Sequence, residues 1–174
     1  MVQTGLVGKV KRERNSELPE FESLRFRFRL GTSDRQRTAP VVKPNHVFIP
    51  LSPTQAKRFS QAMNETGSKK RVSKASGMIH HDDKHVSLFE FYPFGKGPTN
   101  HHAARNGIGT QVHRGIAEYL RRTQPTYTVA WEGYASHPLR RQLEKIGLKN
   151  GKKYPVQTYR EIIMRHERKT RLNN

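Results

Sequence analysis

Directly before a segment of helical periodicity, the chain reads Arg105-Asn106-Gly107-Ile108-Gly109-Thr110. The preceding apolar stretch, Val86 to Tyr92, predicts a strand. Apolar residues at every fourth position predict a helix from Gly109 to Arg122, which Pro125 ends. A strand, a glycine-containing turn and a helix in this order indicate an α/β arrangement in which the helix starts at the turn.

Three further elements are predicted on the C-terminal side of this unit. Tyr127 to Trp131 has the composition of a strand, and Pro138 to Ile146 has the apolar spacing of a helix that Gly147 ends. Tyr159 to Met164 is interpreted as the last strand of the fold.

The clearest pattern on the N-terminal side is Leu24-Arg25-Phe26-Arg27-Phe28-Arg29-Leu30. Its period of two predicts a strand with apolar side chains on the core and three guanidinium groups on the opposite face. A polyanion would relieve the repulsion between these groups, and so would acidic residues on a neighbouring strand.

The remaining N-terminal segments are shorter. Gly31 to Pro44 is interpreted as a loop, and His46 to Ile49 as a strand. Ser52 and Pro53 are residue types that often start a helix, and this helix is expected to end at Gly67. Gly77 to Ile79 is interpreted as another strand.

These elements together predict a single domain of the α/β or α+β class, with a mixed central β-sheet flanked by helices. The domain is expected to span residues 21–164. A basic N-terminal segment, residues 1–20, would precede it, and a basic C-terminal tail, residues 165–174, would follow it.

The composition indicates a polyanionic partner. The 174 residues include 33 Lys and Arg against 14 Asp and Glu, which gives a formal net charge of +19. Only residues 76–104 have no excess of positive charge, because they contain two basic and three acidic residues. Such a charge favours contact with nucleic acid, and RNA, tRNA or the ribosome is the expected partner, although no base-reading module separates RNA from DNA.

Two clusters are the candidate nucleic-acid contacts. The first is the arginine ridge of the alternating strand, and the second is a run expected to be a basic loop or edge strand. The candidate residues are Arg25, Arg27, Arg29, Lys69, Lys70, Arg71 and Lys74.

Several classes of protein are excluded or disfavoured. The chain has no cysteine, which excludes a disulfide framework, a Cys-ligated zinc site and a Cys nucleophile. No apolar run approaches the ~18 residues of a membrane span, and no secretory h-region is visible, so we expect a cytoplasmic protein without a membrane partner. The run from His80 to His85 is interpreted as a solvated turn and not a metal site, because adjacent strand residues point to opposite faces.

Gly107 and Gly109 indicate an anion site, because glycines before a helix let backbone N–H groups converge on a phosphate. The dinucleotide fingerprint is incomplete, since Val112 occupies the place of its third glycine. The lysine and Ser/Thr of a P-loop are also missing.

In this context the segment resembles the GNAT superfamily of acyl-CoA N-acyltransferases, over about residues 77–164. Gly107 and Gly109 match the two small positions of its signature, Arg/Gln-x-x-Gly-x-Gly/Ala. Glu144-Lys145-Ile146-Gly147-Leu148 resembles the end of a second family segment, Tyr-Glu-Lys-Leu-Gly-Phe.

The resemblance implies acetyl-CoA (or CoA) as the cofactor. The residues that would bind it are Tyr92, Arg105, Asn106, Gly107, Ile108, Gly109, Thr110 and Ser136. The chain departs from the family at three positions. Ala104 stands at the first signature position, Leu143 replaces the tyrosine that often protonates the CoA thiolate, and Ser136 replaces an asparagine.

The resemblance also directs attention to a catalytic base and acid. Glu90 stands alone among the apolar residues of its strand, where burial would raise its pKa, and some family members carry a base glutamate there. A strand glutamate that faces solvent is the alternative. Tyr134 follows the next strand and is the candidate acid, with Tyr154 a weaker one.

Two functions follow from the sequence. One is an acetyl-CoA-dependent N-acetyltransferase associated with RNA or the ribosome, which transfers the acyl group directly to an amine. The other is a weakly active or inactive protein of the same fold that serves as a ribosome- or RNA-binding component.

Overall fold

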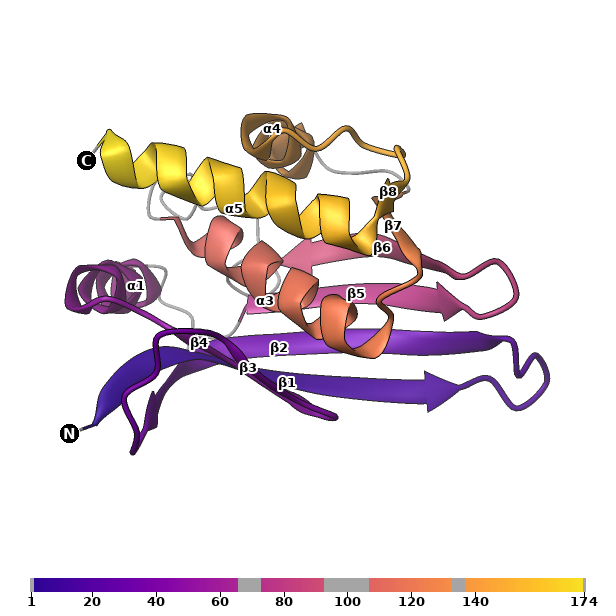
Figure 1. Ribbon diagram of the computed structural model, residues 1–174, viewed down its shortest axis with the longest axis horizontal. Coiled ribbons are helices and arrows are strands. Elements are labelled where there is room, and N and C mark those ends of the chain that lie inside the picture. Colours follow the sequence, from indigo (N-terminus) through magenta and orange to yellow (C-terminus); the bar gives the residue numbers. More distant parts are fainter. Residues whose placement is uncertain (1, 66–72, 93–106, 133–136, 174) are drawn as a thin grey trace.

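The computed structural model describes residues 2–65, 73–92, 107–132 and 137–173. Within these ranges, eight strands form one mixed sheet in the order β3-β4-β1-β2-β5-β6-β7-β8, accompanied by four helices (Figure 1). The strands are β1 (Gln3–Arg14), β2 (Phe21–Ser33), β3 (Val41–Lys43), β4 (His46–Pro50), β5 (Ser73–His80), β6 (His85–Tyr92), β7 (Thr128–Trp131) and β8 (Tyr154–Pro155). The helices are α1 (Pro53–Glu65), α3 (Ile108–Thr123), α4 (His137–Ile146) and α5 (Val156–Leu172). The predicted fold class, a single α/β domain on a mixed sheet, is confirmed.

The alternation predicted for β2 is confirmed. Leu24, Phe26 and Phe28 are buried, and the three arginines beside them are exposed. The buried side chains define the inner face of the sheet, and the arginines define its outer face.

The expected separate N-terminal segment is wrong, because residues 3–14 form β1 in the interior of the sheet, between β4 and β2. Two glycines conceal its alternation. A Cβ on Gly5 would lie 2.3 Å from the ring of Phe48, and one on Gly8 would lie 2.4 Å from the ring of Phe28. Both positions therefore require glycine for packing and carry no apolar side chain for a sequence pattern to detect.

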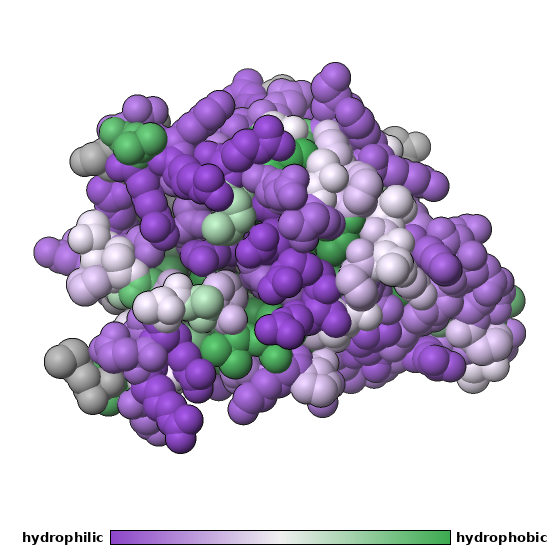
Figure 2. Space-filling view, viewed as in Figure 1, coloured by the Kyte–Doolittle hydropathy of each residue, from purple (hydrophilic) through white to green (hydrophobic). Residues whose placement is uncertain are grey.

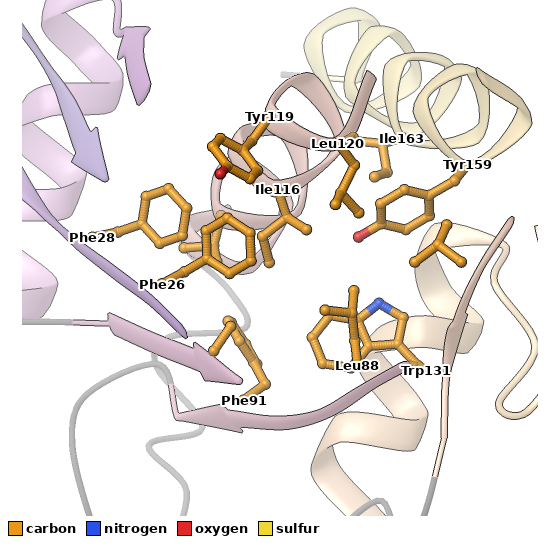
Figure 3. Packing of buried hydrophobic residues seen from close by; sticks show 14 of the residues in the cluster. Phe26, Phe28, Leu88, Phe91, Ile116, Tyr119, Leu120, Trp131, Tyr159 and Ile163 are labelled. Carbon is orange, nitrogen blue, oxygen red and sulfur yellow. The ribbon is translucent and has the colours of Figure 1, made fainter. Parts of the chain in front are cut away.

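The described helices share one core with the inner face. Ile116 and Leu120 of α3 and Tyr159 and Ile163 of α5 point toward Phe26 and its neighbours (Figure 3). In the view of Figure 2 the surface is mainly hydrophilic, with scattered apolar residues. None of the described helices combines the length and apolarity needed to cross a membrane.

The predicted last strand is wrong, because residues 159–164 lie within α5. Tyr159, Ile163 and Glu167 are buried at intervals of four residues, which is the spacing of a helix that packs along one side. Residues 165–172 continue this helix, so the expected basic tail is also part of the domain.

Several local predictions are confirmed. Ser52 starts α1 as a capping box, since its Oγ accepts a hydrogen bond from the Gln55 N–H at 3.1 Å and its N–H donates to Gln55 Oε1 at 2.9 Å. Gly147 ends α4 with a φ of 101°, and Leu148 N–H bonds to Leu143 O at 2.8 Å. The loop predicted over residues 31–44 is partly wrong, because β2 extends to Ser33 and β3 lies within it.

Two buried carboxylates hold α3 against α5. Glu118 on α3 accepts hydrogen bonds from Arg160 at 2.7 Å and from Arg121 at 3.2 Å. Glu167 on α5 accepts a second set, from Gln111 at 3.2 Å, Arg114 at 3.3 Å and Arg171 at 2.7 Å. The helix pair that covers the sheet is therefore joined by paired charges as well as by apolar packing.

Candidate functional site

The parallel strands β6 and β7 pair over only four residues. Their register runs from His85 opposite Thr128 to Leu88 opposite Trp131, and the last bond is Glu132 N–H to Leu88 O at 2.7 Å. β6 continues to Tyr92 and stays paired with β5 on its other side. Within the described residues, the 89–92 part of β6 therefore has a strand partner on one side only, and its free backbone groups can bond an extended ligand.

β6 contains a bulge at the point where the strands part. Leu88 lies opposite Gly77 and Glu90 lies opposite Ser76, so Phe89 is an extra residue without a partner in β5. A Cβ on Gly77 would lie 2.4 Å from the Ser87 carbonyl oxygen, so the opposite strand approaches the bulge as closely as only glycine allows.

The bulge decides the position of Glu90. Strict alternation would place Glu90 on the inner face with Val86 and Leu88, but one extra residue reverses the faces. Phe91 is buried and Glu90 is exposed on the outer face. The expected burial of Glu90 is therefore wrong, and the alternative, a strand glutamate that faces solvent, describes its position.

The start of α3 lies at the same end of the sheet. In a crossover between parallel strands, the helix begins beside the carboxyl end of the first strand, and α3 runs back along β6 in this way (Figure 1). Gly107 is its N-cap, with a φ of 72°, and no side chain among the described residues forms a cap hydrogen bond. The first turn also holds no acidic residue, so no carboxylate of that turn competes with an anion for the positive end of the helix dipole.

The second glycine of the pair has a different role. Gly109 is buried, and a Cβ there would lie 1.3 Å from Nε2 of Gln142 on α4. Gly107 thus supplies a left-handed backbone, whereas at Gly109 the amide end of the Gln142 side chain occupies the place that a Cβ would take. Several predicted site residues lie outside the described residues. These are the cofactor-binding residues Arg105, Asn106 and Ser136 and the candidate acid Tyr134. The side chains of Tyr92 and Ile108 are also not described.

His113 of α3 fills the space where β6 and β7 separate on the inner face. Its ring lies 5.5 Å from that of Phe91 on β6 and 5.0 Å from that of Trp131 on β7 (the two strand residues are labelled in Figure 3). Burial lowers the pKa of His113 to about 3, so the ring is neutral at physiological pH. Its Nδ1 lies 3.1 Å from the hydroxyl of Tyr159, whose pKa burial raises.

One ring nitrogen at this position lacks a partner. Nε2 of His113 is buried without a hydrogen bond in the described part of the protein. An unsatisfied buried polar group costs about 1–3 kcal/mol. A ligand that supplied a hydrogen-bonding atom here would remove that cost.

The outer face near the same opening carries a polar cluster that sequence reasoning missed. Glu132, which follows β7, accepts a hydrogen bond from Ser87 Oγ at 2.6 Å and lies 3.0 Å from Nε2 of His85. The other nitrogen of His85 lies 2.8 Å from the Thr128 hydroxyl, and His80 Nε2 lies 3.3 Å from Ser87 Oγ. We call Ser87, His85 and Glu132 the outer cluster.

The outer cluster keeps Glu132 ionised. Partial burial raises its pKa, but hydrogen bonds from Ser87 and His85 outweigh that effect, and the net pKa is lowered. The side chain is 35% exposed, so an external cation can reach it. Ser87 and His85 are 45 and 47 residues away in sequence, which left no local signal for the cluster.

Leu143 is fully buried in the core. The hydroxyl of Tyr154, the weaker candidate acid, accepts a hydrogen bond from the Lys149 N–H at 3.0 Å.

The predicted nucleic-acid contacts fall into two groups. Arg25, Arg27 and Arg29 are exposed on the outer face, and Lys74 is half-buried on the same face of β5. Lys69, Lys70 and Arg71 lie outside the described residues. β5 itself is an interior strand between β2 and β6, so residues 73–76 form neither a loop nor an edge. Among the described residues, no group of three His, Asp or Glu side chains is placed to hold a metal ion.

Comparison of the chain with protein-family models, with curated proteins and with solved structures finds no match.

Proposed function

We propose that this protein is an acetyl-CoA-dependent N-acetyltransferase that transfers the acetyl group directly to an amine. The observation that carries the proposal is the opening between β6 and β7, at the same end of the sheet as the glycine start of α3. The resemblance of residues 77–164 to the GNAT superfamily supports the same function.

The chain's own groups fit the cofactor. The N-terminus of α3 at Gly107, which no described side chain caps, suits a pyrophosphate, because a helix N-terminus presents N–H groups and a positive dipole end. The free side of β6 from Phe89 to Tyr92 offers peptide groups to the two amides of the pantetheine arm. The unpartnered Nε2 of His113 lies beneath this opening, in a ring that packs between Phe91 of β6 and Trp131 of β7.

The outer cluster is suited to bind the amine that accepts the acetyl group. Acetyl-CoA would supply a thioester, whose acetyl carbon forms a C–N bond with the amine as the C–S bond breaks. The amine must lose a proton in this exchange. Glu132 is ionised and partly exposed, so it attracts an ammonium group and orients its N–H bonds. Glu90, exposed on the same face, is the second carboxylate able to take the proton, and Tyr134 stays the predicted acid.

The cofactor site is tested by Thr110→Glu. Thr110 lies in the first turn of α3, where an added carboxylate stabilises the helix by about 0.3–1 kcal/mol but repels a pyrophosphate. We expect isothermal titration with acetyl-CoA to give binding to the wild type and at least a tenfold loss for Thr110→Glu, without a lower Tm.

Thr158→Glu is the matched control, because Thr158 occupies the equivalent third position of α5. This variant should bind acetyl-CoA as the wild type does. A folded wild type that shows no binding heat would overturn the proposal, and equal losses in both variants would move the cofactor away from α3.

The two carboxylates are distinguished by Glu132→Gln and Glu90→Gln. We expect Glu132→Gln to lower the rate of CoA thiol release, measured over a panel of primary amines, by about 100-fold without changing acetyl-CoA affinity. If Glu90→Gln alone gives this loss, Glu90 is the base and Glu132 is not required.

The burial of Leu143, in place of the family's tyrosine, favours a second candidate function, a binding protein with little turnover. Acetyl-CoA binding without thiol release for any amine tested would support this second function.

A further inference from the structure

The outer face of the sheet carries a line of basic residues at right angles to its strands. The register places Lys43 opposite His46, His46 opposite Lys9, Lys9 opposite Arg27 and Arg27 opposite Lys74. We call these five residues, on β3, β4, β1, β2 and β5, the transverse row. Adjacent strands lie about 4.8 Å apart, so the row extends roughly 19 Å across the sheet.

A second basic line crosses the row. Arg25, Arg27 and Arg29 follow β2, where alternate residues are about 6.6 Å apart, and Lys11 of β1 lies opposite Arg25. On the described residues of these five strands, the outward carboxylate is Glu13, which pairs with Lys11 at 2.8 Å. On these five strands, the positive charge of the outer face therefore greatly exceeds its negative charge.

This arrangement is unfavourable for the isolated protein. Like charges that lie directly opposite on neighbouring strands destabilise a sheet, and Arg27 has such a neighbour on each side. The pKa of His46 is lowered by its partial burial and, to a smaller extent, by the charges of Lys43 and Lys9. A bound polyanion would relieve the repulsion.

We propose that the transverse row binds the phosphate backbone of single-stranded nucleic acid. Four positive groups, with His46 between the first two, lie in a line on an open sheet face, which suits a flexible chain with one negative charge per nucleotide. No described helix projects from this face into a duplex groove. This surface lies apart from the β6–β7 opening, and the proposal does not depend on acyl transfer.

The test compares two double variants of equal charge. Lys9→Gln with Arg27→Gln removes the centre of the row, and Lys57→Gln with Arg58→Gln removes one lysine and one arginine from the exposed side of α1. Binding of a labelled 20-nucleotide single-stranded RNA is followed by fluorescence anisotropy from 50 to 300 mM salt. Each lost phosphate contact should reduce the slope of log K against log salt by about 0.7.

We expect the row variant to bind at least tenfold more weakly and to lose about 1.4 from the salt slope, since two contacts are removed. The α1 variant should change both values little. The Tm of the α1 variant should match that of the wild type. The Tm of the row variant should equal or exceed that of the wild type, because the like charges of Lys9 and Arg27 no longer oppose each other. Lys43→Gln with Lys74→Gln, which removes the charges at the two ends of the row, gives a second test if the first variant fails to fold.

Equal weakening by the row and α1 variants would overturn the proposal, because binding would then follow net charge. Tighter binding of duplex RNA than of the single strand would also overturn it. The row variant should keep wild-type affinity for acetyl-CoA, so a failure here is separate from a failure of the proposed enzyme.

Discussion

Lowering the pH from 7 to 5 is expected to destabilise the protein by about 2 kcal/mol through His113 alone. The folded protein keeps this ring neutral, with a pKa of about 3, whereas the unfolded chain protonates it below its ordinary value of 6.5. The unfolded state therefore binds more protons in this range, and stability falls as pH decreases from 6.5 toward 3. The slope is about 1.4 kcal/mol per pH unit.

Urea unfolding at pH 7, 6 and 5 measures this slope, and His113→Phe is the comparison. Phenylalanine keeps an aromatic ring between Phe91 and Trp131 but cannot be protonated. His46 and His166, whose pKa values are also lowered, remain in both proteins, so the difference between the slopes isolates His113. Identical pH dependence in the two proteins would contradict the buried, neutral state of this ring.

Glu167→Ala is expected to cost about 3–5 kcal/mol of stability, which lowers the Tm by roughly 6–20 °C. The Glu167 side chain is 6% exposed and the Arg114 side chain 10% exposed, so the substitution leaves a buried guanidinium without its carboxylate. Gln111 loses its acceptor at the same time. The contact between α3 and α5 should weaken as a result.

Glu161→Ala is the control, because Glu161 lies on the same helix but is exposed. This substitution should change the free energy of unfolding by no more than about 0.5 kcal/mol. Glu167→Gln should fall between the two, since the amide keeps an acceptor oxygen but loses the charge. Similar Tm values for Glu167→Ala and Glu161→Ala would show that the buried pair adds no stability.

Elements whose pattern lies within a few consecutive residues were predicted correctly from the sequence. β2 has an uninterrupted alternation from Leu24 to Phe28, and α4 ends at a glycine with positive φ. α5 was predicted incorrectly, because Tyr159, Ile162 and Ile163 have strand-like composition. Its helical character rests on packing against α3 through Glu167, a contact with a distant part of the chain.

The candidate site was only partly predictable for a similar reason. The glycine start of α3 is visible in six consecutive residues. The position of Glu90 depends on one extra residue in β6, and a bulge of this kind has no signature in an otherwise alternating apolar strand. The outer cluster joins β6 to the residue after β7, and only the parallel register brings these groups together.

The transverse row has a consequence for how this protein tolerates sequence change. Exchange between lysine and arginine at its positions 43, 9, 27 and 74 preserves the charge, so such substitutions can accumulate there without loss of charge. A single inserted or deleted residue within β1 acts differently, because it would turn Lys9 toward the core and bring Val10 to the surface. Chains of equal net charge but shifted strands would lack the row, so nucleic-acid binding through this face would depend on strand register rather than on basic composition.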